Sequence, residues 1–173
     1  MAELADELVN QITWKIPNAL VLIGSRSGEE QNAMTASWVT QVSMEPVLIA
    51  VGIDNKAVTH RLVSEGGSFT VNLWDATDTK VFVKFSKPAT LGRDSEGRAT
   101  LNERLIRIGA TGAPIFEDAI GWMECTVKQA IDVGTHTLFV GELIAAGVRD
   151  PEARAAAMSD TRMKYGGVRR GGH

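Results

Sequence analysis

The order of hydrophobic and polar positions predicts a chain built mainly from β-strands. A compact apolar run over residues 19–23 is followed by the turn-rich segment 24–28, GSRSG. Pro46 introduces a second apolar run over residues 47–53, which we expect to form another strand. Runs of this length bounded by turn residues are typical of strands buried in a sheet.

Strict alternation predicts further strands. Phe69, Val71 and Leu73 alternate with polar residues and Trp74, so we expect one face in a core and the other facing solvent or a partner. Residues 122–128 alternate in the same way. A final strand is predicted over residues 136–148, paired with its predecessor through a hairpin at residues 132–134.

Helices are fewer and shorter. Residues 57–65 carry an apolar stripe at helical spacing, with Asn55 as a plausible N-cap and Gly66 as the left-handed stop. A second helix is predicted from Asp78 to about Phe85, and a third, short one over residues 151–158. The segment 90–112 has no clear period and is expected to be an excursion over the surface.

These elements predict at least six strands and two or three helices in one domain, residues 1–173, with a short flexible C-terminal tail from about residue 160. A mostly antiparallel chain must close or cover its sheet edges, which favours a mainly β fold: a β-barrel with peripheral helices. From the pattern alone a β-sandwich remains an alternative.

Composition narrows the function classes. The hydrophobic fraction of 44% is that of an ordinary globular protein, and the net charge of −3 argues against a nucleic-acid partner. No apolar run approaches the ~20 residues that span a bilayer, and the acidic start is not a secretory signal, so we expect a cytoplasmic protein without a membrane partner. The single Cys125 is read as a small buried thiol.

The sequence lacks the common motifs of self-contained catalysis. It contains no GxSxG, GxxxxGK[ST], HExxH or GxGxxG pattern. Its three histidines, His60, His136 and His173, are far apart and only one cysteine is present, so we expect no metal site. This composition suits a protein whose chemistry belongs to a bound cofactor.

Candidate cofactor-binding residues are found on three segments. Residues 32–38, NAMTASW, resemble a strand whose edge meets a ligand, with Thr35 and Ser37 on one face. Asn55, Lys56 and Thr59 lie at a predicted helix start, where amides and the dipole favour an anion such as a phosphate. The third segment adds a cation and a hydroxyl, Lys84 and Ser86.

Each candidate also has an ordinary structural interpretation. Threonine and serine are compatible with any strand, Lys84 with a solvated helix face, and Asn55 with a helix cap. Trp38 could equally belong to a core or an interface, and His136, beside a hairpin turn, could be a structural histidine.

Four segments, taken in order, strengthen the binding interpretation. They are NAMTASWVTQVSMEPVLIAVG from Asn32, AVTHRLVSEGGSFTVN from Ala57, VKFSKPA from Val83 and GTHTLFVGEL from Gly134. In order and spacing they resemble the flavin reductase-like proteins, the FMN-binding split-barrel family, and the resemblance covers nearly the whole chain.

The resemblance implies a Greek-key-like split β-barrel, a homodimer, that binds FMN, or in some members FAD, at or near the subunit interface. It implies that the flavin ring and ribityl chain meet Asn32, Met34, Thr35, Ala36, Ser37 and Trp38. The phosphate would be held by the regions containing Ile53, Asn55, Lys56 and Thr59, and by Lys84, Phe85 and Ser86. His136 would lie near the flavin and the nicotinamide.

Two hypotheses follow from the resemblance. In the first, hydride passes from NADH or NADPH to flavin, and reduced flavin or its electrons reach a partner monooxygenase or another electron acceptor. In the second, the chain is a flavin-binding electron-transfer protein with little nicotinamide activity. Family members often carry Asp immediately before the histidine, where this chain has Thr135, which mildly favours the second hypothesis.

Overall fold

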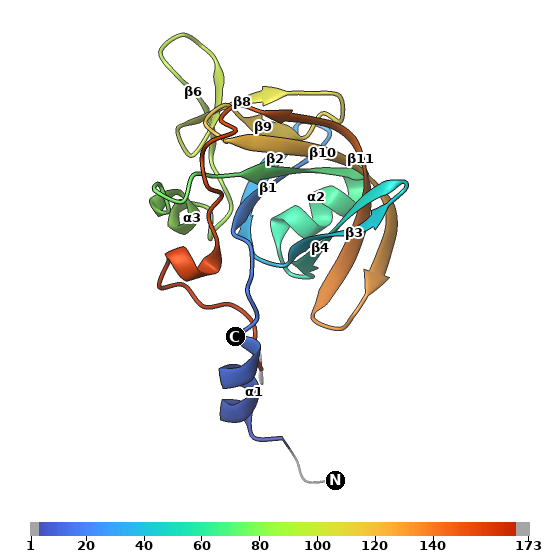
Figure 1. Ribbon diagram of the computed structural model, residues 1–173. Helices are drawn as coiled ribbons and strands as arrows, with labels where there is room; N and C mark the ends of the chain where they lie inside the picture. The colour runs from blue at the N-terminus through green and yellow to red at the C-terminus, as the bar shows by residue number, and fades with distance from the viewer. Residues whose placement is uncertain (1–3, 169–173) are drawn as a thin grey trace.

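A curved antiparallel sheet of seven strands dominates the computed structural model, which describes residues 4–168 (Figure 1). The strands follow the spatial order β2-β1-β5-β10-β11-β4-β3. Their bounds are β1 Val21–Ser27, β2 Glu30–Ala36, β3 Val39–Met44, β4 Val47–Asp54, β5 Ser68–Leu73, β10 Gly121–Asp132 and β11 His136–Val148.

The ends of this sheet show why it curls. Strands β2 and β3 are the first and last of the seven, yet only Ser37 and Trp38 join them. In a flat sheet these two strands would lie roughly 29 Å apart, whereas a linker of this length spans only about 10 Å. The sheet therefore bends round towards closure, which confirms the prediction of a mainly β, barrel-like fold with peripheral helices.

A second, smaller sheet covers part of the first. It has the order β6-β7-β8-β9, formed by β6 Leu91–Arg93, β7 Ala99–Leu101, β8 Arg104–Ile108 and β9 Pro114–Phe116. The expectation of an irregular excursion over residues 90–112 is therefore wrong. Strands of three residues are too short to show a period, and their pairing depends on contacts with neighbouring strands.

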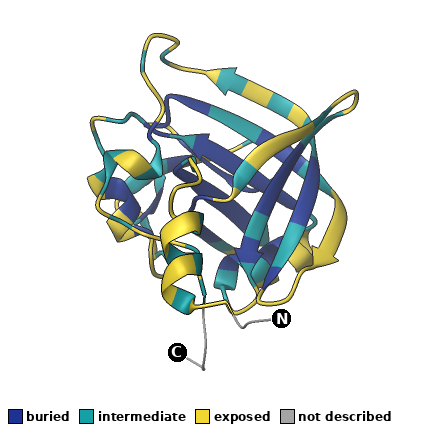
Figure 2. Ribbon diagram, turned by 60° about the horizontal axis from the view of Figure 1, so that its bottom comes forward, coloured by how far each residue is buried: buried dark blue, intermediate teal, exposed yellow. Residues whose placement is uncertain are grey.

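Both faces of β1 are buried, which defines two cores. Leu20 and Leu22 pack in a cluster with the aromatic residues Phe82, Phe85 and Phe116. Val21 and Ile23 point the other way, into a cluster inside the curved sheet. Figure 2 shows the buried residues along the central strands, with exposed residues at the hairpin tips. The alternation of two apolar faces follows directly from the pleat of the strand.

Strand β1 also extends further than predicted. Residues 24–27 continue the strand, and the turn begins only at Gly28, whose φ of 58° is left-handed. Gly24 is needed inside the strand, because a Cβ atom there would come within 2.3 Å of the Pro114 carbonyl oxygen and the Thr70 hydroxyl. The sequence prediction took Gly24 for a turn residue, whereas the close approach of Pro114 and Thr70 is what requires glycine there.

The polar face of β5 is buried, contrary to the prediction that it meets solvent or a partner. Thr70 and Asn72 are fully buried, and Asn72 Oδ1 accepts a hydrogen bond from the Phe116 amide of β9 at 2.9 Å. Asn72 Nδ2 donates to the Leu22 carbonyl. Trp74, on the same face of the pattern, is 2% exposed and belongs to the core. The polar positions therefore join the two sheets.

The helices agree only in part with prediction. Helix α2, Val58–Gly66, begins after Ala57 rather than at an Asn55 cap, and its left-handed stop is Gly67, with φ of 71°, rather than Gly66. Helix α3 covers Lys80–Lys84, with Val81 and Phe82 buried as expected. Helix α1, Asp6–Thr13, was not predicted.

The expected helix over residues 151–158 is wrong. Ala155 forms an isolated β-bridge with Asp75, and Ala157 forms one with Ala19. The amide of Ala156 donates to the Trp74 carbonyl, so pairing with distant segments overrides the helical preference of this alanine-rich stretch. Only the 3₁₀ turn η1, Met158–Asp160, follows.

Cys125 is buried, as predicted, and burial together with the neighbouring Glu124 charge raises the pKa of its thiol to about 12. The thiol therefore stays protonated at neutral pH. Within residues 4–168, no helix has the length and apolar character needed to cross a membrane.

Candidate functional site

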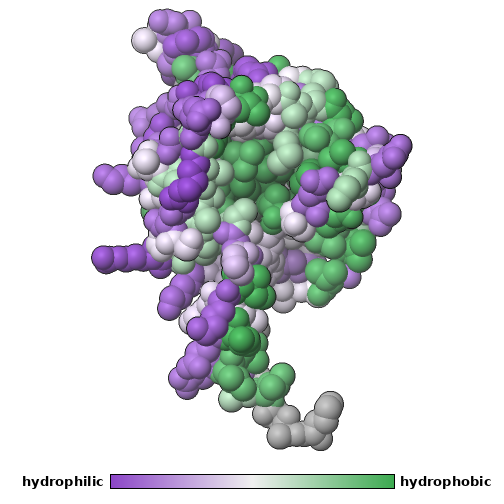
Figure 3. All heavy atoms as spheres, in the orientation of Figure 1, coloured by the Kyte–Doolittle hydropathy of each residue, from purple (hydrophilic) through white to green (hydrophobic). Residues whose placement is uncertain are grey.

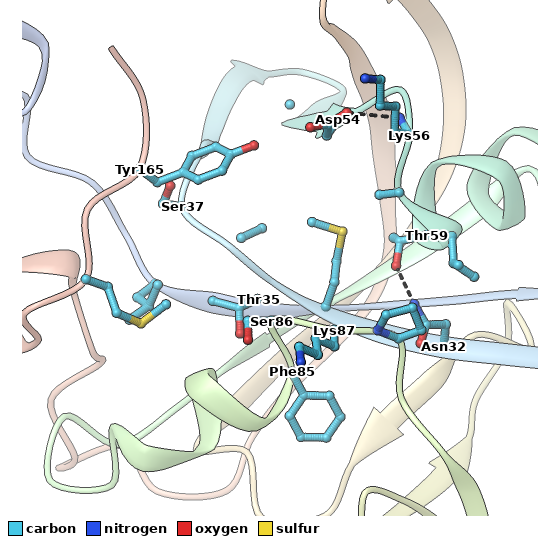
Figure 4. Close-up of a pocket in the computed structure, with 18 of the residues that line it drawn as sticks. Asn32, Thr35, Ser37, Asp54, Lys56, Thr59, Phe85, Ser86, Lys87 and Tyr165 are labelled. Atoms are coloured by element: carbon cyan, nitrogen blue, oxygen red, sulfur yellow. Dashed lines mark hydrogen bonds between the residues drawn. The ribbon is translucent and has the colours of Figure 1, made fainter. Parts of the chain in front are cut away.

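A cavity of 390 Å³ opens where four segments of the chain meet (Figure 4). Its walls come from β2 and the linker after it, the end of β4 with the start of α2, the turn after α3, and the C-terminal tail. The face in Figure 3 is hollowed in its middle, where apolar residues gather. A cavity of this size and mixed lining is typical of small-molecule sites.

One end of the cavity is formed by the start of α2. The N-cap residue is Ala57, and no side chain caps the helix, so its first-turn amides have no side-chain acceptor. Ala57, Val58 and Thr59 all line the cavity. Lys56 and Lys87 lie on the same lining and contribute positive charge. This end can bind an anion through the helix amides, the helix dipole and two lysines.

The segments around this end are joined through Asn32. Its side chain is 3% exposed, and Nδ2 donates to Thr59 Oγ1 at 3.0 Å, the bond drawn in Figure 4. Its Oδ1 accepts a hydrogen bond from the Ala89 amide at 2.7 Å. One amide group therefore fixes β2 against α2 on one side and against the segment after Lys87 on the other.

The floor of the cavity is the edge of β2. Met34, Thr35 and Ala36 line it, followed by Ser37. The Thr35 hydroxyl hydrogen is already used within the protein, because Oγ1 donates to the Phe82 carbonyl at 2.7 Å. The Thr35 amide donates to the Phe85 carbonyl at 3.0 Å. The threonine therefore anchors the end of α3 to the sheet and leaves an apolar surface around Met34 and Ala36.

The structure brings nine of the predicted binding residues to the cavity lining. They are Asn32, Met34, Thr35, Ala36, Ser37, Lys56, Thr59, Phe85 and Ser86. Sequence reasoning missed a further set of lining residues, among them Asp54, Lys87, Pro88, Met158, Met163, Lys164 and Tyr165. Lys87 and Pro88 belong to the VKFSKPA motif, which was the signal available for them.

Four predicted binding residues do not line the cavity. Ile53 is fully buried in the core inside the curved sheet. Asn55 Nδ2 donates to the Gly134 carbonyl at 2.8 Å and its Oδ1 accepts from Thr137, so its side chain ties the α2 approach to the β10–β11 hairpin. Lys84 is exposed on α3. Trp38 packs against His136 and Tyr165 instead of lining the cavity.

His136, the predicted catalytic residue, is 7% exposed and also does not line the cavity. Its Nδ1 lies 2.8 Å from Thr135 Oγ1 and its Nε2 lies 2.7 Å from the Tyr165 hydroxyl. The Trp38 ring packs at 4.8 Å between centroids. Of this group, Tyr165 is the residue that lines the cavity.

The cavity combines an anion-binding end with apolar walls. Among the described residues 4–168, no group of three or more His, Cys, Asp or Glu side chains could hold a metal ion. This arrangement can hold a ligand with an anionic end and a flat apolar body, and the chemistry would then reside in the ligand itself.

Comparison with known proteins relates this chain to a family. The family model for the flavin reductase like domain matches residues 14–168. A ferric-chelate reductase (NAD(P)H) of Archaeoglobus fulgidus is 31% identical, covering 78% of this chain and 78% of that protein. An uncharacterised protein of the same organism is 33% identical over 82% of this chain and 78% of its own length.

Solved structures show the same fold. The NADH:FAD oxidoreductase of Streptomyces globisporus superposes with a TM-score of 0.77, at 24% identity, covering 99% of this chain and 98% of that one. The styrene monooxygenase flavin reductase of Pseudomonas putida gives a TM-score of 0.68 at 26% identity, covering 81% and 87%. The curved sheet and its peripheral elements are therefore a recurring architecture.

Proposed function

The chain belongs to the flavin reductase-like domain family, and on that premise we propose that it is an NAD(P)H-dependent flavin oxidoreductase. Its flavin, FMN or FAD, would be held in the cavity beside α2. The observation that carries the proposal is the meeting, in one cavity, of an uncapped helix start, two lysines and an apolar strand edge. That combination suits a ligand with a phosphate and a flat ring system.

The phosphate would bind at the α2 end. First-turn amides at Val58 and Thr59 supply hydrogen-bond donors, and the helix dipole favours negative charge. Lys56 and Lys87 add positive charge on the same lining. We therefore assign the phosphate role foreseen for Lys84 to Lys87, and we leave Asn55 as a residue that positions the helix approach.

The ring system would lie along β2 and its linker. Met34 and Ala36 give an apolar surface, and Phe85 and Ser86 form the adjoining wall. When bound there, a flavin would supply a ring able to accept hydride from a reduced nicotinamide. The chain's task is to hold both groups in contact, which supplies much of the rate without an acid or base. Within residues 4–168, no cysteine, histidine or glutamate lies on the cavity lining, which fits a reaction carried by the bound group.

We infer that the reduced flavin, or its electrons, passes to a partner oxidoreductase such as a monooxygenase. Support comes from the similar flavin reductase of Pseudomonas putida, whose name ties it to styrene monooxygenase.

We also propose that the chain forms a homodimer. Nine of its exposed large apolar residues lie on α1 and just after it, and on the hairpins β3–β4 and β10–β11: Leu8, Ile12, Trp14, Ile16, Val42, Met44, Ile131, Val133 and Ile144. In Figure 3 one side of α1 is apolar and the opposite side polar. Sedimentation equilibrium should give twice the chain mass of 18.6 kDa, and a value equal to one chain would exclude the dimer.

Anaerobic reduction tests the proposed function directly. The purified protein is mixed with FMN or FAD, oxygen is removed, and NADH or NADPH is added while the flavin absorbance is followed. Bleaching much faster than with free flavin would support the oxidoreductase and identify the donor. Bound flavin that stays oxidised would favour an electron-transfer protein, and no binding of either flavin would overturn the assignment of the cavity.

A pair of lysines in the VKFSKPA motif gives a matched test of the phosphate end. We expect Lys87→Ala to weaken FMN binding about tenfold, because it removes a cation from the cavity lining. Lys84→Ala removes the same charge from the exposed side of α3 and should leave binding unchanged. Fluorescence titration of FMN measures both. Equal losses in the two variants would show that general electrostatic attraction, and not contact, is responsible.

A further inference from the structure

The C-terminal tail, residues 162–168, crosses the cavity and ends beside α1. Figure 1 shows this red segment returning from η1 to the blue N-terminal helix. On the way, Met163, Lys164 and Tyr165 line the cavity. The tail is therefore part of the cavity wall, although Met163 lies 104 residues beyond Thr59 of α2 and 127 beyond Ala36 of β2.

Tyr165 connects the cavity with His136. Its hydroxyl lies 2.7 Å from His136 Nε2, and its ring packs edge-on against Trp38 with 5.0 Å between centroids. In Figure 4 the Tyr165 ring extends beside Ser37 at one end of the cavity, away from Thr59. Because His136 does not itself line the cavity, its influence on a bound ligand would pass through the tyrosine.

Helix α1 holds the tail in this position. Asn10 Oδ1 accepts a hydrogen bond from the Val168 amide at 2.8 Å, and Trp14 Nε1 donates to the Gly166 carbonyl at 3.3 Å. The Lys164 ammonium lies 4.6 Å from the Trp14 ring centroid, a cation–π contact. No residue of α1 is buried. The helix therefore holds the tail through these individual contacts and not through a packed core.

Glycines allow the tail to pass so close. Gly166 and Gly167 have φ of 102° and 82°, values that residues with a side chain rarely adopt. A Cβ atom at Gly167 would lie 2.1 Å from Asn10 Oδ1, and one at Gly166 would lie 3.3 Å from Trp38. The backbone is thus shaped to lie between the tryptophan and α1, immediately after Tyr165.

We propose that Tyr165 contacts the flavin ring, that His136 acts on the reaction only as a positioning residue through the Tyr165 hydroxyl, and that Asn10 of α1 positions the tail. This rests on the proposed function, because it concerns the same cavity. Tyr165 lies opposite the anion-binding end, where the ring of a flavin held by its phosphate would come. The tail then sets how tightly the ring is enclosed and where the nicotinamide can approach.

The shared hydrogen bond gives the first arm of the test. Tyr165→Phe keeps the ring and removes the hydroxyl, whereas His136→Leu removes its partner. Each should slow flavin reduction by NADH or NADPH at saturating donor by about fivefold, the value of one hydrogen bond. The double variant should be no slower than either single variant, because both lose the same bond. Multiplied losses would overturn the proposal and give His136 a role of its own.

The clamp from α1 gives the second arm. Asn10→Ala should raise the FMN dissociation rate about fivefold, because it removes a hydrogen bond that holds the tail over the cavity. Gln11→Ala is the control on the same helix, because Gln11 bonds only to Glu7 among the contacts found for it. If Asn10→Ala behaves like Gln11→Ala, the tail is not positioned by α1.

The two arms separate this inference from the proposed function. Flavin binding and dissociation are measured by fluorescence and need no nicotinamide, so the tail can be tested even in a protein without reductase activity. In such a protein, Tyr165→Ala should still change the fluorescence of bound FMN, because it removes a ring from the cavity wall. Wild-type reduction with unchanged fluorescence in Tyr165→Ala would retain the function and reject the contact.

Discussion

Replacing Asn32 by leucine is expected to weaken flavin binding about 100-fold while leaving the protein folded. Leucine has nearly the same shape, so the change removes hydrogen bonds without opening a cavity. In the wild type, Asn32 Nδ2 donates to Thr59 Oγ1 at 3.0 Å, and Asn32 Oδ1 accepts from the Ala89 amide at 2.7 Å. Both segments carry the proposed phosphate site, and a buried group left without its partner costs about 1–3 kcal/mol. Fluorescence titration gives the affinity, and thermal unfolding checks the fold.

A thermodynamic cycle with Thr59 sharpens this prediction. Thr59→Val breaks the same hydrogen bond from the other side and leaves the Asn32 Nδ2 group buried without an acceptor. In the double variant both polar groups are gone, so its loss of affinity should be smaller than the sum of the two single losses. Thr59→Ser, which keeps the hydroxyl, is the control and should bind like the wild type.

The cycle can contradict the assigned role of Asn32. Strictly additive losses would mean that Asn32 and Thr59 act on the flavin independently, and that the bond between them does not hold the site together. Unchanged affinity in Asn32→Leu, with a normal unfolding temperature, would place the phosphate elsewhere than at the start of α2.

The floor of the candidate site could be predicted because it depends on local pattern. The pattern of residues 32–38 predicts a strand whose edge meets a ligand. In the structure, Asn32 and residues 34–37 line the cavity, while Ala33 is buried in the core. The position of α2 was also predicted to within two residues, because the apolar stripe over residues 57–65 repeats at helical spacing.

Other parts of the site depend on contacts that no local pattern contains. Asn55 precedes a helix, as a binding or capping residue would, but its partners Gly134 and Thr137 are 79 and 82 residues away. Lys84 and Lys87 look alike in the sequence, and only the end of α3 at Lys84 decides which one faces the cavity. Tyr165 is brought to the site by contacts with α1, a helix that was not predicted.

The buried polar residues of the two sheets show the same limit. Alternation in β5 predicted a face exposed to solvent or a partner, because a hydrophobic pattern assigns only apolar positions to the core. Thr70 and Asn72 are buried since β9 supplies partners for them, and β9 is too short to be recognised. The polar residues of β5 therefore form hydrogen bonds between the two sheets and do not face solvent.

Such a joint underlies the largest effect on stability that we expect: Glu124→Ala should lower the free energy of unfolding by about 3 kcal/mol. Glu124 is 2% exposed. Its Oε1 accepts hydrogen bonds from the Thr111 amide and hydroxyl at 2.9 and 2.8 Å, and its Oε2 accepts from the Ala110 amide at 3.2 Å. Alanine would leave these donors unpaired beside an empty space. Chemical denaturation, with the slope compared to wild type, measures the loss.

Two conservative variants separate the parts of this effect, because one replaces a single acceptor oxygen and the other removes a single donor. Glu124→Gln keeps the shape and one acceptor oxygen and should cost less than alanine, while Thr111→Val removes only the hydroxyl and should cost about 1 kcal/mol. Neither Glu124 nor Thr111 lines the cavity, so flavin affinity should stay unchanged in each folded variant. A loss of affinity as large as the loss of stability would mean that the loop between β8 and β9 supports the cavity directly. If alanine and glutamine cost the same, the charge on the carboxylate, and not its two oxygens, holds that loop in place.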